Sequence, residues 1–383
     1  MPRIAPFAPP LALALLGILL TPAPVAAQPA DPVAGRSAAA PTSEGEWTTL
    51  GLLRVRDMTP FGLNRLDLLP AHAVDFPPGS FGLEVNLTYQ NTWVMSRNVE
   101  DLLSAGGTER RRIGPQEVAA ILALPGDAYL VDGEFGLVDT TLHYRMTERF
   151  GLYVQLPWYF FGGGFLDKTI EDFHGAAGLS NGGRDLGRRD DWVIVAGIGE
   201  GEFVVTEAPS ADFGDPVLGL RWTPFERPRR WNVVVEGAFK LVVRDRRRLV
   251  STGTTDYGLQ LSLQRFFRRN ALYLSLAQVW VSSPERAFAD DEWIPTAVAG
   301  WETRLTRRAN LVLQLYGSRS TIRETPLEEL AADKLQATLG VQWRRGDTVL
   351  RLGLTENLAN FDNTPDVGVT FSIGRILGLD RAP

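Results

Sequence analysis

Few residues in this chain could carry out catalysis, and their spacing matches no catalytic motif. The 383-residue sequence contains three histidines (His72, His143 and His174) and no cysteine. The lack of cysteine excludes thiolate catalysis, cysteine-ligated metals and disulfides. The sequence also contains no phosphate-binding glycine loop, no histidine pair at metal-ligand spacing and no Gly-x-Ser-x-Gly turn. We therefore predict a protein that is not an enzyme and that needs no cofactor or metal.

The polar residues of this chain lie in segments in which apolar and polar residues alternate. In residues 81–90, apolar Leu83, Val85 and Leu87 alternate with polar Glu84 and Asn86. A period of two residues predicts a β-strand with one apolar face and one solvated face. Segments of this kind occur at 81–95, 130–147, 150–161, 214–224, 231–243, 254–265, 270–282, 293–306, 309–319, 332–344, 348–356 and 366–374. About twelve antiparallel strands predict an all-β, transmembrane up-and-down barrel over residues 81–375.

The connections between these strands alternate in length. Those at 147–149, 225–230, 266–269, 307–308 and 345–347 are short, whereas those at 96–129, 162–213, 244–253, 283–292, 320–331 and 357–365 are longer. Outer-membrane barrels have short periplasmic turns at one rim and long extracellular loops at the other. A soluble β-sandwich has no reason to sort its loops in this way. The long loops include an expected short helix at 114–123 and β-rich stretches near 192–195 and 203–206.

Tryptophans near the predicted strand ends support a membrane environment. Seven of them lie there: Trp93, Trp158, Trp222, Trp231, Trp280, Trp293 and Trp343. Aromatic rings at strand ends can form girdles at the level of the lipid headgroups. The short turns are also rich in arginine, which either reflects their solvation or forms a basic rim that meets lipid phosphates.

The polar face of the barrel should carry ionisable residues of both signs. The candidates that line the lumen are Glu84, Asp139, His143, Arg145, Arg221, Glu236, Lys240, Glu302, Arg304, Lys334 and Arg351. A barrel of about twelve strands has a narrow interior. These charges can either pair across the lumen and fill it, or line a narrow path for small polar solutes. On this face, His143 points away from the lipid side, where an outer-membrane phospholipase carries its His–Ser dyad.

The N-terminus predicts export from the cytoplasm. Arg3, an apolar run at 11–20 and the small residues before Gln28 follow the order of a signal peptide, which we place at residues 1–27. Residues 28–50 are rich in Ala, Pro, Ser and Gly and are expected to be a disordered linker. Residues 51–80 precede the barrel and are expected either to plug the lumen or to lie along the periplasmic rim. Residues 376–383 would form a C-terminal tail.

Two motifs resemble a known family. Residues 59–66, Thr-Pro-Phe-Gly-Leu-Asn-Arg-Leu, and the stretch from Phe173-His-Gly to Asn181-Gly-Gly-Arg-Asp are similar to those of proteobacterial proteins that carry domain of unknown function 3187. The resemblance runs from about Gly51 to the C-terminus and implies a secreted outer-membrane barrel. It implies no activity and no functional residue.

These patterns together favour a Gram-negative outer-membrane channel or transporter for small solutes. The alternatives are a structural barrel with a filled lumen and an outer-membrane lipid hydrolase. The expected partners are outer-membrane lipid, the barrel-assembly machinery and an unidentified small solute. Lys+Arg total 39 against 45 Asp+Glu, a net charge of -6. This acidic balance gives no electrostatic reason to expect a nucleic-acid partner.

The last expected strand departs from the usual barrel pattern. Assembly signals usually place an aromatic residue at the end of both the last strand and the chain. Here the last strand carries Phe371 and Ile373, and a tail follows them.

Overall fold

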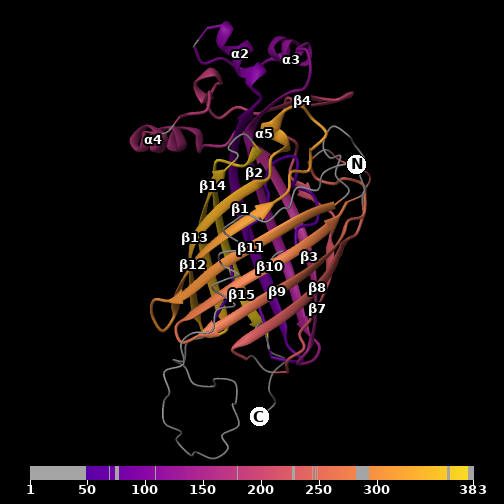
Figure 1. Cartoon of the computed structure of the whole chain (residues 1–383), viewed down its shortest axis with the longest axis vertical. Helices are drawn as coiled ribbons and strands as arrows, with labels where there is room; N and C mark the ends of the chain where they lie inside the picture. The colour runs from indigo at the N-terminus through magenta and orange to yellow at the C-terminus, as the bar shows by residue number, and fades with distance from the viewer. Residues whose placement is uncertain are drawn as a thin grey trace, which may run out of the picture.

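Twelve antiparallel strands form a closed barrel in the computed structural model, which describes residues 49–377 except 69, 74–76, 108, 179, 227–228, 244, 246, 248, 282–292 and 360–362 (Figure 1). The barrel strands are β1 (Phe81–Met95), β2 (Ala128–Arg145), β3 (Phe150–Gly162), β7 (Val217–Trp222), β8 (Trp231–Lys240), β9 (Tyr257–Phe267), β10 (Asn270–Trp280), β11 (Trp293–Arg304), β12 (Ala309–Ser318), β13 (Lys334–Arg345), β14 (Thr348–Ala359) and β15 (Val367–Leu377). The predicted signal peptide, most of the linker and most of the C-terminal tail lie outside the described residues.

The barrel closes where its first and last strands meet. β1 pairs with β15 from Phe81↔Leu377 to Asn91↔Val367, and on its other side it pairs with β2 along its whole length. β2 in turn pairs with β3, and the remaining strands follow in chain order. Closure leaves these twelve strands without a free edge, which removes the unpaired backbone groups that lipid could not satisfy. The predicted fold class and strand number are confirmed.

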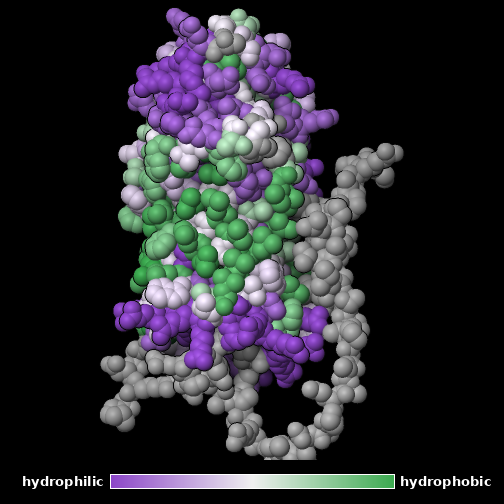
Figure 2. Space-filling view, turned by 90° about the vertical axis from the view of Figure 1, so that its left-hand side faces the viewer, coloured by the Kyte–Doolittle hydropathy of each residue, from purple (hydrophilic) through white to green (hydrophobic). Residues whose placement is uncertain are grey.

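The outside of the barrel carries an apolar belt. Figure 2 shows this belt as a band between two polar ends. It includes exposed Leu83 and Leu87 on β1, Leu259 on β9 and Leu339 on β13, whereas the residues that alternate with them are buried or partly buried. The belt follows from the alternation in the sequence, because neighbouring side chains on a strand point to opposite faces.

The tryptophan girdle forms only in part. Trp222, Trp231, Trp293 and Trp343 are exposed near strand ends, as expected. Trp93 is buried instead, and its Nε1 donates a hydrogen bond to the Gly182 carbonyl at 2.9 Å. The expectation of a lipid-facing ring was therefore wrong for Trp93, because β1 ends and β2 begins within the loop region, where their residues pack against loops.

The two ends of the barrel differ, and we name them by their connections. The turn end carries short connections such as 268–269 and 346–347, and the loop end carries the long ones. The loop end holds α2 (Arg97–Ala105), α3 (Pro115–Leu122), α4 (Asp167–Ala177), the 3₁₀ turn η1 (Arg184–Leu186), β4 (Val193–Ile198), β5 (Gly201–Val205), β6 (Asp212–Phe213) and α5 (Glu328–Ala331). Figure 1 shows α2, α3 and α4 beyond this end. None of the helices among the described residues is long and apolar enough to cross a membrane.

Candidate functional site

Residues 49–68 and 70–73 lie inside the barrel, and we call them the inner segment. Its first arm uses backbone groups to bind lumen side chains of distant strands. Leu53 N donates to Gln314 Oε1 at 2.8 Å, and Gln314 Nε2 donates back to the Leu53 carbonyl at 3.1 Å. Gln342 Nε2 donates to the Gly51 carbonyl. Glutamine has both a donor and an acceptor, so it can pair with an extended backbone as a neighbouring strand would.

The second arm returns towards the turn end. Leu66 N donates to Asp256 Oδ2 at 2.9 Å, and Ala73 N donates to Gln264 Oε1 at 3.0 Å. His72 Nε2 lies 3.0 Å from Thr49 Oγ1, which joins the two ends of the inner segment. The segment therefore enters the lumen at the turn end, bends near residues 59–65 and returns to the same end.

The bend of the inner segment closes the loop end of the lumen. Met58, Phe61 and Leu63 are buried in an apolar cluster with residues of β2, β4 and the long loops. The Phe61 ring meets Tyr129 edge-on, with ring centroids 6.3 Å apart. Phe61 and Leu63 come from the first family-like motif, residues 59–66. An apolar seal of this kind excludes water from the end of the lumen that faces the long loops.

Glu302, Lys334 and Lys240, which were expected to line the lumen, hold the inner segment directly. Glu302 accepts hydrogen bonds from Leu50 N at 2.8 Å and Gly51 N at 3.2 Å. Lys334 Nζ lies 2.6 Å from Asp57 Oδ2. Lys240 Nζ donates to the Asn64 carbonyl at 3.1 Å and forms an ion pair with Asp256 at 2.8 Å.

Another group of expected residues gathers near the turn end around Glu84. Arg54 of the inner segment lies 3.1 Å from Glu84 through Nε, and Arg351 lies 3.4 Å from the same carboxylate. His143 is buried and its Nε2 lies 3.4 Å from the Arg54 guanidinium. One carboxylate is thus shared by two guanidinium groups. Sequence reasoning did not select Arg54, although its charge in the segment before the barrel was a usable signal.

The remaining expected residues bind the wall or the rim. Arg221 and Glu236 form an ion pair at 2.5 Å, and Tyr153 donates to Glu236 at 2.6 Å. Asp139 is buried on the same face as His143. Arg145 lies at the turn end, where its guanidinium donates to the Thr147 and Glu148 carbonyls. Arg304 is partly buried at the turn end of β11.

Two glycines of the wall make room for the inner segment. Gly300 and Gly340 lie on the lumen faces of β11 and β13. A Cβ at Gly300 would lie 2.4 Å from Leu52 Cδ2, and one at Gly340 would lie 2.8 Å from Leu53 Cδ1 and 2.7 Å from the Leu352 carbonyl of β14. Any larger side chain would collide with the segment, so these positions are matched to its presence.

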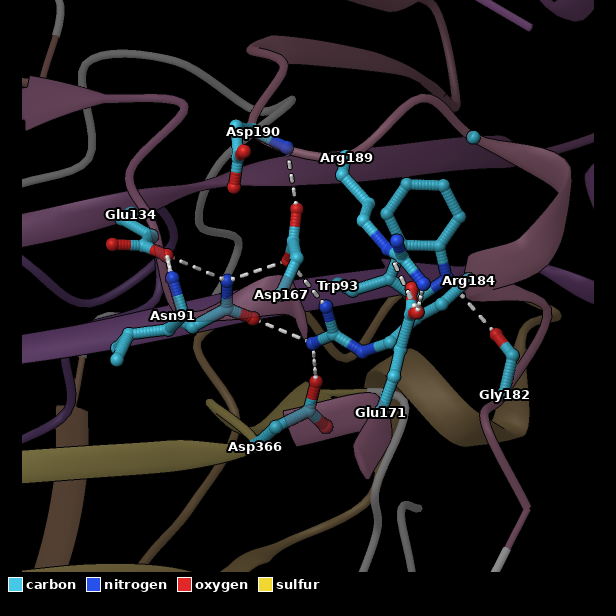
Figure 3. Close-up of polar contacts among 12 residues, drawn as sticks. Asn91, Trp93, Glu134, Asp167, Glu171, Gly182, Arg184, Arg189, Asp190 and Asp366 are labelled. Atoms are coloured by element: carbon cyan, nitrogen blue, oxygen red, sulfur yellow. Dashed lines mark hydrogen bonds and ion pairs between the residues drawn. The ribbon is translucent and has the colours of Figure 1, made fainter. Parts of the chain in front are cut away.

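A second polar cluster ties the long loops together beyond the lumen (Figure 3). Buried Arg184, from the second family-like motif, lies 2.7 Å from Asp167 of α4 and also pairs with Asp366 and Asn91. Burial raises the pKa of Asp366, an effect that Arg184 partly opposes. Glu171 of α4 pairs with Arg110 at 2.7 Å and with Arg189 at 2.5 Å. We call this group the loop cluster, and it joins β1, α4, η1 and the β14–β15 connection.

The chain has structural similarity, at low sequence identity, to solved outer-membrane proteins. No curated protein matches the chain. Among solved structures, it is similar to an outer membrane channel from Pseudomonas putida F1, with 12% identity, a TM-score of 0.49 and coverage of 81% of this chain and 100% of that chain. It is also similar to the toluene transporter TodX from Pseudomonas putida, with 9% identity, a TM-score of 0.34 and coverage of 78% and 89%.

The family comparison covers most of the chain. A model of the family described as "Protein of unknown function (DUF3187)" matches residues 102–375, which include the loop cluster except Asn91 and every barrel strand except β1 and the end of β15. More than half of the 383 residues are matched. The chain therefore belongs to this family of proteins of unknown function.

Proposed function

We propose that this protein is an outer-membrane channel for small solutes whose lumen is closed by its own inner segment. The observation that carries the proposal is that backbone groups of this segment bind polar side chains of the lumen wall, such as Gln314, Gln342 and Glu302. Each glutamine can exchange its protein partner for water at a net cost of only about 0.5–1.5 kcal/mol per hydrogen bond, and the Glu302 carboxylate at about 1.5–3 kcal/mol. A wall of this kind can be hydrated when the segment leaves.

The membrane assignment rests on the exterior. The apolar belt between two polar ends supports insertion in a lipid bilayer, and the exposed tryptophans near strand ends support contact with its headgroup region. The proposed partners are outer-membrane lipid and the barrel-assembly machinery. The latter would recognise β15, on which Phe371 and Ile373 face outward.

A structural barrel with a permanently filled lumen is the second candidate. Apolar packing of Leu53 and Val55 against Val312 and Tyr316 favours it. The buried bend around Phe61 favours it as well. Such packing is lost when the segment leaves, and burial of each large aliphatic side chain contributes about 1.5–3 kcal/mol.

Single-channel recording in a planar bilayer separates the two candidates. We would compare residues 28–383 with the variant Gly300→Leu, whose Cβ would lie 2.4 Å from Leu52 Cδ2. A channel predicts brief openings of the unaltered protein and longer openings of the variant. The double variant Leu52→Gly/Gly300→Leu restores the space and should return openings to the original frequency.

Openings of the unaltered protein would exclude a permanently filled lumen. Silence from the folded G300L variant, and from a variant without residues 49–73, would contradict the channel and support a filled lumen. Folding of each variant is checked by the heat-dependent mobility shift of the barrel in electrophoresis. Openings that appear only in the deletion variant would also contradict a gate that moves under native conditions.

A further inference from the structure

A cavity opens at the turn end of the lumen beside the Glu84 group. It has a volume of about 100 Å³ and lies between the inner segment and strands β1, β2, β7, β13, β14 and β15. A single water needs roughly 10–15 Å³ by the same kind of measure, so the cavity can hold several waters or a small solute. Thr49, Leu50 and Arg54 of the inner segment form one of its walls. We call this cavity the mouth.

The mouth has an excess of positive charge. Its lining includes the five arginines Arg54, Arg221, Arg344, Arg351 and Arg375. Only two carboxylates, Glu84 and Asp347, line it with them. Glu236, which does not line the mouth, neutralises Arg221 through an ion pair of 2.5 Å between Glu236 Oε2 and Arg221 Nε. Since Glu84 is shared by Arg54 and Arg351, the paired groups still leave a net positive charge around the cavity.

Two of these guanidinium groups are positioned and only partly used. Arg54 is held by Glu84, by Thr141 Oγ1 at 3.1 Å and by His143. Among the described residues, these contacts engage three of the five N–H groups that arginine carries. Arg351 is held by Gln342 Oε1 at 3.1 Å, by the Leu50 carbonyl at 3.4 Å, by Ser372 Oγ at 3.5 Å and by Glu84. Fixed guanidinium groups lose little side-chain entropy when they bind an oxyanion, and their planar shape suits carboxylate and phosphate.

We propose that the mouth is a binding site for a small soluble oxyanion, a carboxylate or phosphate, held between Arg54 and Arg351. Glu84 competes with this ligand for the same two guanidinium groups and so sets its affinity. The proposal names a solute class for the proposed channel. Binding at the mouth does not require the inner segment to move, so it is measured on the closed barrel and stands or falls apart from conduction.

The test is calorimetric titration of the detergent-solubilised protein with inorganic phosphate at low ionic strength. Binding should weaken about tenfold in Arg351→Gln and in Arg54→Gln, because each variant removes one of the two positive charges. It should tighten about tenfold in Glu84→Gln, because the competing carboxylate is lost. Increased affinity on removal of a structural ion pair is not expected from a general loss of folding. Added salt should weaken binding in every variant.

The matched control is Arg345→Gln, which removes an exposed arginine from the turn end of β13 without altering the lining of the mouth. Its phosphate affinity should equal that of the unaltered protein. The proposal is overturned if the unaltered protein binds no phosphate, if R345Q weakens binding as much as R351Q does, or if E84Q also weakens it.

The source of the oxyanion is tested in lipid nanodiscs. Because the barrel wall separates the mouth from the bilayer, phosphate affinity should be the same in phosphatidylcholine and in phosphatidylglycerol nanodiscs. Loss of phosphate binding in phosphatidylglycerol alone would assign the arginines to lipid headgroups and would overturn the proposal of a soluble ligand.

Discussion

Lys334 of β13 and Asp57 of the inner segment form a buried ion pair, with Nζ and Oδ2 2.6 Å apart. Lys334 Nζ also donates to Thr59 Oγ1 at 3.0 Å. The two charged residues are 277 positions apart in the chain. This pair fixes the position of the inner segment in the lumen. Any displacement that separates the two charges leaves both buried without a partner, which raises the free energy by much more than the intact pair lowers it.

Replacement of one partner should release the bend of the inner segment. We expect Lys334→Met to weaken its docking by about 3–5 kcal/mol, since the variant leaves Asp57 buried and unpaired. The double variant Lys334→Met/Asp57→Leu should recover most of this loss. Limited proteolysis of residues 49–73 measures the effect. Lys168→Met, which breaks an exposed pair with Asp172, is the control and should leave cleavage unchanged. Equal protection in K334M and the unaltered protein would show that the pair does not anchor the segment.

The loop cluster should depend on Arg184. Its side chain is 3% exposed and joins Asp167, Asp366 and Asn91, so Arg184→Met leaves two buried carboxylates without their cation. We expect hydrogen exchange to rise at least tenfold in α4 and in residues 181–191, with the barrel strands unaffected. Arg188→Met removes an exposed arginine four positions away and serves as the control. A rise of the same size in R188M would rule out a specific role for Arg184.

Docking of α4 should be lost in acid. Although burial alone raises the pKa of Glu171, hydrogen bonds from Arg189 and Arg110 outweigh it and lower that pKa from its ordinary value of 4.5. A lowered carboxyl pKa stabilises the folded form fully above the ordinary value, and the stabilisation is lost as the pH falls through the lowered value. Hydrogen exchange in α4, corrected for the intrinsic rate, should therefore increase below about pH 4.5. In Glu171→Gln this pH dependence should be much weaker; an unchanged profile in that variant would refute the assignment.

A charged residue at the centre of the apolar belt should destabilise the barrel in a lipid bilayer. Leu339 of β13 is 55% exposed and lies across from Leu313 and Leu354 on the neighbouring strands. We expect Leu339→Arg to reduce the free energy of folding into lipid vesicles by about 2–4 kcal/mol if the position lies at the bilayer midplane. Glu202→Arg, on the exposed part of the β4–β5 hairpin, should change it little. Equal stability of L339R and the unaltered barrel would argue against a lipid-facing belt.

The local alternation of apolar and polar residues was enough to predict the strands of the barrel wall and the face on which each side chain lies. The alternation of Leu83, Glu84 and Val85 assigns each side chain to one face, because neighbouring residues on a strand point in opposite directions whatever the strand pairs with. The order of short and long connections then fixed the two ends of the barrel. Strand limits agree closely for the same reason: the first strand was predicted at 81–95 and is observed at Phe81–Met95. The eleven candidate charges were selected by the same alternation.

Only the tertiary structure decided what lies inside that wall. Residues 49–73 carry no strict alternation, and an arginine or aspartate there is equally compatible with a periplasmic surface and with a wet lumen. Their place is set by partners that are distant in sequence, such as Gln314 for Leu53 and Lys334 for Asp57. The prediction that Trp93 faces lipid was wrong for a related reason. The end of its strand lies beyond the apolar belt, where Trp93 contacts Gly182, a loop residue 89 positions away in the sequence. Pairings across hundreds of residues depend on closure of the whole barrel, and no local period encodes them.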